Sequence, residues 1–407
     1  MNDGYFSKRG VWIASLLNSL FMLGLTYYWL QQNITYGDEV TLVKFTSILR
    51  RIVLGNEQKP NKKEVLFVNV SHDLILIDLL DDDGFPIGNQ PIVDRTKLSE
   101  FLLKTKNRHR YILCDIFFKD ASPSDSVLQA ALNQTQKIVV SYHLNETALD
   151  TPIFKVNRGI SDYETFDGMF FKFPILHQDS LPSTPLVLYH EIEKATYEST
   201  EFATKLNGHP VLNTFIVDFR VRPYDLFEAP LDKRYAVVNL GEMLMANDSM
   251  FQAMIQDKIV ILGDFYEHDI HETFYGDVPG PLILYNVFLD LRAGDNIISP
   301  FISLFLLIIY LIFSYNIFAT KKLQDRRFFR ILYKLPLGKF FIEYLSNFLF
   351  LGIASIACYF IFNIHLNILL LGLYLNGFDY VFSAWEAKKI QARELKKNAE
   401  QPEISET

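Results

Sequence analysis

The stretch Lys258–Asp295, KIVILGDFYEHDIHETFYGDVPGPLILYNVFLDLRAGD, predicts a buried strand, a loop rich in ionisable residues and a helix, in that order. The run KIVILGDF is apolar and β-branched, which is typical of a strand that is covered on both faces. The apolar residues from Pro281 to Leu291 favour a helix. A long apolar run begins at Pro300, so the helix connects the loop that is densest in ionisable residues to a predicted membrane segment.

Further apolar runs upstream have the length and composition of buried strands. They alternate with stretches of about ten residues whose apolar spacing fits a helix. The strands are expected at 65–70, 74–80, 111–118 and 137–142, the helices at 94–104 and 123–133, and a connecting helix at 39–54. This alternation predicts an extracytoplasmic α/β domain with a mainly parallel sheet and right-handed crossovers.

Four apolar runs are long enough to cross a hydrocarbon core of about 30 Å. We predict transmembrane α-helices at 11–30, 300–318, 340–362 and 364–385. The first run is longer than the apolar region of a signal peptide and lacks a small-residue cleavage site, which favours an uncleaved anchor. The fold class is therefore an α/β domain plus four transmembrane helices.

The distribution of Lys and Arg predicts the orientation of these helices. Basic residues are concentrated in segments 1–10, 319–339 and 386–407, and the connector 363–365 has none. Because basic segments resist transfer across the membrane, these three are expected to be the cytoplasmic N-terminus, a cytoplasmic loop and a cytoplasmic tail. Residues 31–299 are then expected to lie outside the cytoplasm.

The charge of this outer region excludes one class of partner. Residues 31–299 contain 25 Lys and Arg against 38 Asp and Glu, a net charge of −13. Such an acidic region is a poor partner for nucleic acid. The two cysteines, Cys114 and Cys358, fall in a predicted strand and a predicted membrane span, so no disulfide is expected.

Ligands gather at the carboxyl ends of strands in α/β sheets, and three acidic residues fall at or just after such ends. They are Asp78, Asp115 and Asp264, while Asp125 follows in the loop or first helical turn after Asp115. Their side chains are expected either to bind a ligand or to hold strand ends and cap a helix. The two roles predict the same residue types at these positions.

The loop that begins at Asp264 also contains His268, Asp269 and His271. Carboxylates and imidazoles could hold a divalent metal or form an acid–base pair. Alternatively, these side chains hold a polar loop in shape. Neither HExxH, GxGxxG, GxxxxGK[ST] nor GxSxG occurs, so we assign no catalytic residue and expect no cofactor.

The order of these segments resembles the second class of CHASE domains, which are extracytoplasmic sensor domains of bacterial receptors. The resemblance is carried by VLFVNVSHD at 65–73, YILCDIFF at 111–118, KIVILGDF at 258–265 and DIHETFYGDVPGPLILYN at 269–286. It covers roughly residues 36–299, and one span before the domain and three after it also fit. The recurring residues of the family correspond here to Asp115, Asp125, Gly263, Asp264, Asp269, His271, Thr273, Gly280 and Asn286.

The resemblance implies a sensor in the bacterial inner membrane, with Asp115, Asp125, Asp264, Asp269, His271, Thr273 and Asn286 as candidate ligand-binding residues. Family members usually carry a kinase or cyclase after the last span, whereas here 22 residues remain, too few for a catalytic domain. We therefore expect a non-enzymatic sensor or accessory protein that relays its signal to a separate protein. Its expected partners are the membrane, that protein, an undefined small-molecule or protein ligand and, as one alternative, a second copy of the chain.

Two other functions remain open from the sequence. One is a membrane-anchored metal-dependent hydrolase, for which His268, Asp269 and His271 are the candidate metal ligands. The other is a structural subunit of a cell-envelope complex.

Overall fold

The structure is a computed structural model that describes residues 8–31, 40–46, 59–80, 83, 85–144, 153–178, 180–200, 203–319 and 346–399. Contacts between residues divide the chain into two compact units. The helical unit contains residues 1–32, 36–47 and 299–407, and the α/β unit contains residues 33–35 and 48–298.

A six-stranded sheet forms the centre of the α/β unit, and all of its strand pairs are parallel. This confirms the predicted α/β fold with a mainly parallel sheet. In spatial order, the strands are β15 (Val237–Asn239), β1 (Val65–Asn69), β16 (Ile259–Gly263), β4 (Tyr111–Asp115), β5 (Ile138–Tyr142) and β6 (Arg158–Ile160).

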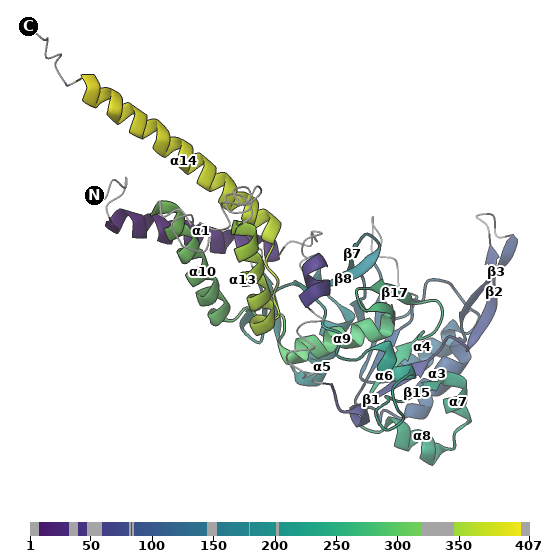
Figure 1. Cartoon of the computed structure of the whole chain (residues 1–407). Coiled ribbons are helices and arrows are strands. Elements are labelled where there is room, and N and C mark those ends of the chain that lie inside the picture. Colours follow the sequence, from purple (N-terminus) through teal and green to yellow (C-terminus); the bar gives the residue numbers. More distant parts are fainter. Residues whose placement is uncertain are drawn as a thin grey trace, which may run out of the picture. The chain divides into compact units, whose positions relative to one another are not determined.

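Helices cover both faces of this sheet, which explains why its central strands are apolar without alternation. Alternate residues such as Leu66 and Val68 belong to a core on one face. Phe67 points to the other face, where its ring lies 5.5 Å from that of Tyr285. The first face carries α3 (Arg95–Thr105), α4 (Asp125–Gln134), α7 (Leu240–Met245) and α8 (Asp248–Ile255), and the second carries α5 (Thr184–Glu193) and α9 (Gly280–Ala293) (Figure 1).

Two predicted helices are confirmed with small changes at their ends. Helix α3 begins after Asp94, whose carboxylate accepts hydrogen bonds from the backbone N–H groups of Thr96 and Lys97 and so caps the helix. Helix α9 contains the predicted helix 281–291 and extends one residue before it and two after it. It is capped at its C-terminus by Gly294, which has a left-handed backbone conformation with φ of 77°.

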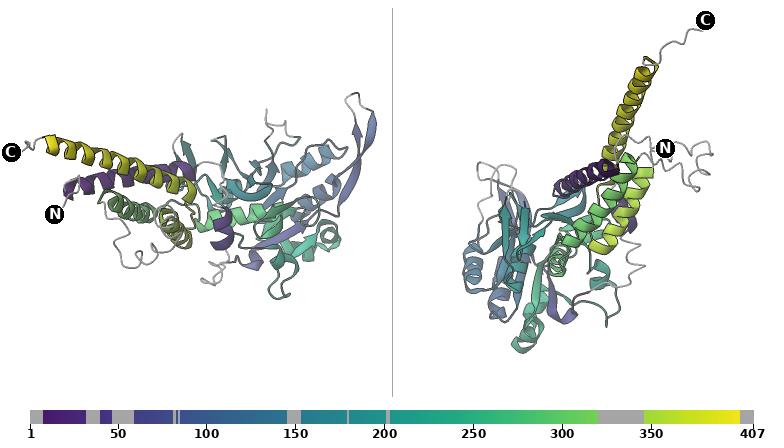
Figure 2. Two further views of the ribbon diagram at one scale, coloured as in Figure 1. Left: turned by 45° about the horizontal axis from the view of Figure 1, so that its top comes forward. Right: turned by 90° about the vertical axis from the view of Figure 1, so that its left-hand side faces the viewer.

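Strand β2 (Leu74–Leu80) is where the sequence predicted a strand, but it does not join the central sheet. It pairs antiparallel with β3 (Pro86–Val93) to form a separate hairpin. This hairpin extends away from the body of the α/β unit in Figure 1 and in the left view of Figure 2.

A second sheet packs beside the central one and provides one side of the candidate site. The predicted loop after residue 264 is only partly a loop, because residues 270–279 form the hairpin of β17 (Ile270–Thr273) and β18 (Gly276–Pro279). The remaining strands of this sheet are β14 (Thr214–Ile216), β8 (Met169–Pro174) and β7 (Glu164–Phe166). Smaller elements are η1 (Lys62–Glu64), β9 (Leu176–His177), β10 (Leu181–Pro182), β11 (Tyr197–Thr200), β12 (Ala203–Leu206), β13 (His209–Val211) and α6 (Pro223–Phe227).

Within the described residues, the helical unit contains three helices that are long and apolar enough to cross a membrane: Arg9–Leu30 of α1 (Lys8–Leu30), Pro300–Phe318 (α10) and Ile368–Lys389 of α14 (Ile368–Ala399). The predicted span at 340–362 corresponds to a shorter helix, α13 (Ser346–Phe362), and residues 340–345 lie outside the described residues. Of the predicted loop 319–339, only residue 319 belongs to the described residues.

Helix α14 departs from the prediction at both ends. It begins at Ile368 rather than 364, and it continues to Ala399, well past the predicted end at 385. The sequence EAKKIQARELKKNA after Trp385 contains no Gly or Pro, and most of its residues are strong helix formers. The expected solvated tail is therefore helical over most of its length (Figure 1).

Residues 40–46 are helical and belong to the helical unit, where Thr46 Oγ1 lies 3.1 Å from His365 Nε2. The rest of the predicted helix 39–54 lies outside the described residues. Polar side chains also join α1 to its neighbours: Asn18 donates to Ser314 at 2.9 Å and accepts from Tyr374 at 2.6 Å. Such hydrogen bonds are a common means of helix association where apolar packing discriminates poorly.

A buried ionic cluster fixes the C-terminal half of α9 within the α/β unit. Asp290 is fully buried, accepts a hydrogen bond from the backbone N–H of Asp218 at 2.8 Å, and pairs with Arg220 Nε at 3.1 Å. One turn earlier, the buried Asn286 side chain accepts from the Val221 N–H and donates to the Val221 carbonyl. These contacts connect α9 to the segment after β14.

Replacing Asp290 with Ala should therefore lower the free energy of unfolding by on the order of 3 kcal/mol, because Arg220 loses a buried partner. Urea denaturation of the full chain, followed by far-UV circular dichroism, would measure the change. Asp248→Ala is the control, since it removes only an exposed pair with Lys106 and should cost less than about 1 kcal/mol. Equal losses in the two variants would show that the cluster does not hold the helix.

Candidate functional site

Parallel pairing brings several polar residues to one edge of the central sheet. The register places Asn69 beside Gly263 and Gly263 beside Asp115, all at the carboxyl ends of their strands. Cys114 pairs with Val140, so Ser141 follows next to Asp115 and hydrogen-bonds its carboxylate. The predicted gathering of side chains at this edge is therefore present.

A cleft of about 360 Å³ opens at this edge. Its apolar wall comes from the base of the β2–β3 hairpin, the loop after β4 and the first turns of α9, and includes Leu74, Ile92, Phe117, Phe118, Ile283 and Leu284. Its polar wall includes Asp115, His143, Tyr163, Asp264, Asp269 and His271. A mostly apolar cavity with a few convergent polar groups is the usual form of a small-molecule site.

The side chain of Asp264 holds the loop that forms the polar wall. Its carboxylate accepts hydrogen bonds from the backbone N–H groups of Tyr266, Glu267 and His268 at 2.9–3.1 Å. Although burial acts to raise the pKa of Asp264, these hydrogen bonds outweigh it and lower the pKa. The alternative that this residue shapes a polar loop is thus supported by its contacts.

A chain of hydrogen bonds runs along the polar wall. Asp269 Oδ1 lies 2.7 Å from His271 Nε2, and His271 Nδ1 lies 2.5 Å from the hydroxyl of Tyr163. The pairing of Ile270 with Pro279 brings Asp269 to the first residue of α9, where the Gly280 N–H donates to the Asp269 carbonyl at 2.8 Å.

Two glycines allow this close approach. A Cβ atom on Gly280 would lie 2.3 Å from Asp269 Oδ2, and one on Gly263 would lie 2.4 Å from Pro281 Cγ. Both distances are shorter than any real contact, so a side chain at Gly263 would press on Pro281 in the first turn of α9, and one at Gly280 would displace the Asp269 carboxylate. The two glycines thus set the spacing between α9 and the carboxylates of the cleft.

The cleft holds two carboxylates that repel each other. Removal from water, and next the negative charge of Asp269, raise the pKa of Asp115 to about 7, although Ser141, His143 and His271 act in the opposite direction. Burial and the same carboxylates raise the pKa of Tyr163 to about 12. A proton or another positive group between Asp115 and Asp269 would relieve this repulsion.

Polar residues at or beside the cleft that the sequence patterns did not predict include His143, Asp162 and Tyr163. His143 Nδ1 lies 2.6 Å from Asp162 Oδ1, and this hydrogen bond is the main cause that raises the pKa of His143. Tyr163, the residue after Asp162 in the sequence, lines the cleft. His143 comes immediately after the strand predicted at 137–142, so the strand-end rule that selected Asp115 would also have selected it. Asp162 and Tyr163 carry no such signal.

Five of the predicted site residues line the cleft: Asp115, Asp264, His268, Asp269 and His271. Three others lie elsewhere. Asp125 forms an ion pair with the buried Arg95, the Thr273 hydroxyl donates to the Gly276 carbonyl in the β17–β18 turn, and Asn286 binds the backbone of Val221. Their contacts stabilise the fold.

The metal candidates do not form a metal centre in the structure. His268 is largely exposed and pairs with Asp264, while Asp269 and His271 bind each other. Across the described ranges, no group of three or more His, Cys, Asp and Glu side chains is arranged to hold a metal ion.

No protein-family model, no curated protein and no solved structure matches the chain. The interpretation of the cleft therefore depends on its own geometry.

Gly280→Ala should disturb the cleft directly, because its new methyl group overlaps the Asp269 carboxylate. We expect a loss of about 1–3 kcal/mol in the free energy of unfolding, as for other substitutions that overfill a packed site. Gly88→Ala is the matched control, since no atom lies within 4 Å of its Cβ position. Chemical denaturation of both variants would measure their free energies of unfolding. A Gly280→Ala protein with an unchanged free energy of unfolding would contradict the described packing.

Asp115 should make stability depend on pH. Its pKa rises from an ordinary value of about 3.9 to about 7, so between these pH values the folded state binds a proton that the unfolded state releases. The free energy of unfolding therefore falls as pH rises through this range. Asp115→Asn should remove part of this fall and raise the Tm at about pH 8, by about 2–4 °C for each kcal/mol of repulsion removed.

Calorimetry of the full chain at about pH 5 and about pH 8 would measure this effect. Glu272→Gln provides the control, because this exposed carboxylate lies on β17 outside the cleft lining. If the wild-type and Asp115→Asn proteins lost the same stability between the two pH values, the carboxylate would not be held as described.

Proposed function

We propose that the protein is a non-enzymatic sensor or accessory protein of a membrane, which binds a small ligand in this cleft and relays binding through α9 to its membrane helices. The observation that carries the proposal is the position of α9: its residues Gly280, Ile283 and Leu284 line the cleft. The resemblance of residues 36–299 to CHASE type 2 sensor domains supports the same role.

The course of the chain after α9 supports a relay. Helix α9 ends at Ala293, and Ile297 then forms a β-bridge with Val211 while the Ile298 N–H donates to the Pro210 carbonyl. The candidate membrane helix α10 begins at Pro300. Only a short segment, fixed to the α/β unit almost to its end, therefore separates a helix of the cleft from a helix suited to the membrane.

The lining of the cleft favours one class of ligand. Asp115 and Asp269 would attract a positive group that takes the place of the proton on Asp115, and the wall with Phe117, Phe118 and Ile283 would accept an apolar portion. A compact organic amine in its protonated form combines both features. The volume of about 360 Å³ is near the lower end of ligand pockets, which limits the ligand to a small molecule.

The proposal includes the orientation inferred from the basic segments. Residues 31–299 would lie outside the cytoplasm of a bacterium, both termini would lie inside, and the inner membrane would hold the helices. The signal would pass to a separate protein, to a second copy of the chain, or to both.

Binding can be tested on the full chain in detergent at about pH 8 with a panel of small primary and quaternary amines and their neutral alcohol analogues. We expect at least one amine to raise the Tm while its neutral analogue does not. Asp115→Asn and Asp269→Asn should abolish the shift, and Glu272→Gln should keep it. An amine shift that survives both cleft substitutions, or no shift with any amine, would contradict the proposed site.

The relay has its own readout, because all three tryptophans, Trp12, Trp29 and Trp385, belong to the helical unit. Ligand binding to the cleft in the α/β unit should therefore change tryptophan emission only if it alters the helical unit. We expect a saturable change with the same concentration dependence as the Tm shift. Binding without any change in emission would leave the site intact and refute the relay.

A further inference from the structure

The β2–β3 hairpin has apolar side chains on both of its faces but little to cover them. Leu74 and Leu76 point to one face, and Ile75, Ile77 and Leu79 point to the other. In the part of the chain that the structure describes, β2 and β3 pair only with each other. A continuous apolar strand of this kind normally lies in a sheet that is covered on both sides.

Large apolar side chains face solvent along the hairpin, from Leu76 near its base to Phe85 and Ile87 near its free end. The exposed fractions are 70% for Leu76, 67% for Phe85 and 63% for Ile87. An isolated two-stranded hairpin is marginally stable in water, and a contiguous apolar patch on a soluble surface usually marks an interaction site. The hairpin therefore has the properties of an arm that another surface covers.

The charge of the arm restricts the kind of surface that can cover it. Residues 74–93 contain four Asp and neither Lys nor Arg, and among them Asp78 and Asp83 are exposed. The α/β unit is itself acidic, so most of its surface would repel the arm. A suitable partner surface must combine positive charge with an apolar cavity.

Among the described residues of the α/β unit, a second cleft of about 260 Å³ next to the loop after β4 is a surface of that kind. Aromatic rings of Phe118, Tyr142 and Phe154 line it, and so do the exposed cations Lys119 and Arg158. The Arg158 guanidinium lies 5.2 Å from the centre of the Tyr142 ring. Within the described ranges, neither cation forms an ion pair with a carboxylate. We call this surface the basic aromatic cleft.

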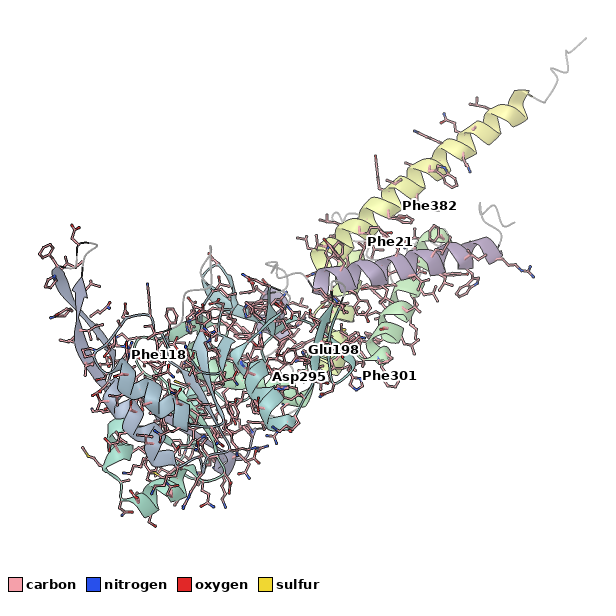
Figure 3. All side chains as sticks on the ribbon, turned by 180° about the vertical axis from the view of Figure 1, so that it is seen from behind. Phe21, Phe118, Glu198, Asp295, Phe301 and Phe382 are labelled. Carbon is pink, nitrogen blue, oxygen red and sulfur yellow. The ribbon has the colours of Figure 1, made fainter. Side chains whose placement is uncertain are left out.

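The arm does not reach this cleft of its own chain. Its base residues Pro91, Ile92 and Val93 line the ligand cleft together with Phe118, and the arm extends outward from there. Figure 3 shows Phe118 on the body of the α/β unit and the arm leading away from it. Among the described residues, the tip of the arm and the basic aromatic cleft of the same chain therefore do not contact each other, and each is open to another molecule.

We propose that the arm of one copy of the chain inserts its tip into the basic aromatic cleft of a second copy, and that the second copy does the same in return. Asp78 and Asp83 would face Lys119 and Arg158, while Phe85 would enter among the aromatic rings. This is an isologous, self-complementary contact, the commonest kind in homodimers. It identifies the surface by which the second copy named under the proposed function binds, and it requires no ligand in the other cleft.

A charge exchange on the full chain tests this arrangement. Copies with two different affinity tags are co-expressed and the fraction that co-purifies is measured. The arm variant Asp78→Lys with Asp83→Lys, expressed in both copies, should co-purify at least tenfold less, and so should the cleft variant Lys119→Glu with Arg158→Glu. One copy of each should restore co-purification, because both contacts then join opposite charges.

Glu198→Lys with Asp248→Lys is the matched control. Both carboxylates are exposed, on β11 and α8, and the substitution changes the net charge by the same amount as the arm variant. It should leave co-purification unchanged. Restoration by the mixed pair also shows that the two reversed variants fold.

Chemical cross-linking locates the contact. Phe85→Cys in one tagged copy and Lys119→Cys in the other should give a dimer with a short bismaleimide, whereas Phe85→Cys paired with Glu198→Cys should not. A wild-type chain that does not co-purify with itself, or an arm variant that still does, would overturn the proposal. Capture of a different protein by the arm, without a second copy, would also overturn it.

Discussion

The contact between Gly263 and Pro281 determines the arrangement of the α/β unit around its candidate site. The absence of a side chain at Gly263 lets the first turn of α9 lie directly against the end of β16, beside Asp115. The Gly280 position allows the same close approach to Asp269. Further along the helix, Asn286 and Asp290 bind the segment after β14. One end of α9 thus forms a wall of the cleft while the other end is anchored by buried polar contacts.

This arrangement explains why polar residues are concentrated at one edge of an otherwise apolar sheet. Six parallel strands end together, and the backbone there no longer pairs with a neighbour, so a side chain such as Asn69, which accepts from the Phe265 N–H, supplies a missing hydrogen bond. Asp115 and Asp269 meet in this setting, and the groups that act to lower the pKa of Asp115 are Ser141, His143 and His271. The resulting repulsion destabilises the protein when no ligand is bound. A positive ligand would relieve this repulsion, so the same two carboxylates favour its binding.

Residue patterns predicted the regular parts of this structure better than its site. The runs at 65–70, 111–118, 137–142 and 258–265 identify central strands because burial on both faces requires continuous apolar sequence. The same apolar pattern in LILIDLL predicts a strand correctly but does not show that this strand lies outside the central sheet. An arm buried by a partner and a strand buried in a sheet need the same residues. Asp125, Thr273 and Asn286 illustrate another limit: a polar residue that holds the fold and one that binds a ligand look alike in sequence. Tyr163 joins the cleft only through the pairing of β7, β8 and β17, which no local pattern encodes.

The unbroken length of α14 has a mechanical consequence. At about 1.5 Å per residue, its 32 residues form a rod of about 48 Å. A tilt of about 10° at its first residue would sweep its last residue through about 8 Å, an amplification that a flexible tail could not provide. The helix is thus a lever, and a small rearrangement among the helices that pack against its base would become a large displacement at its charged end.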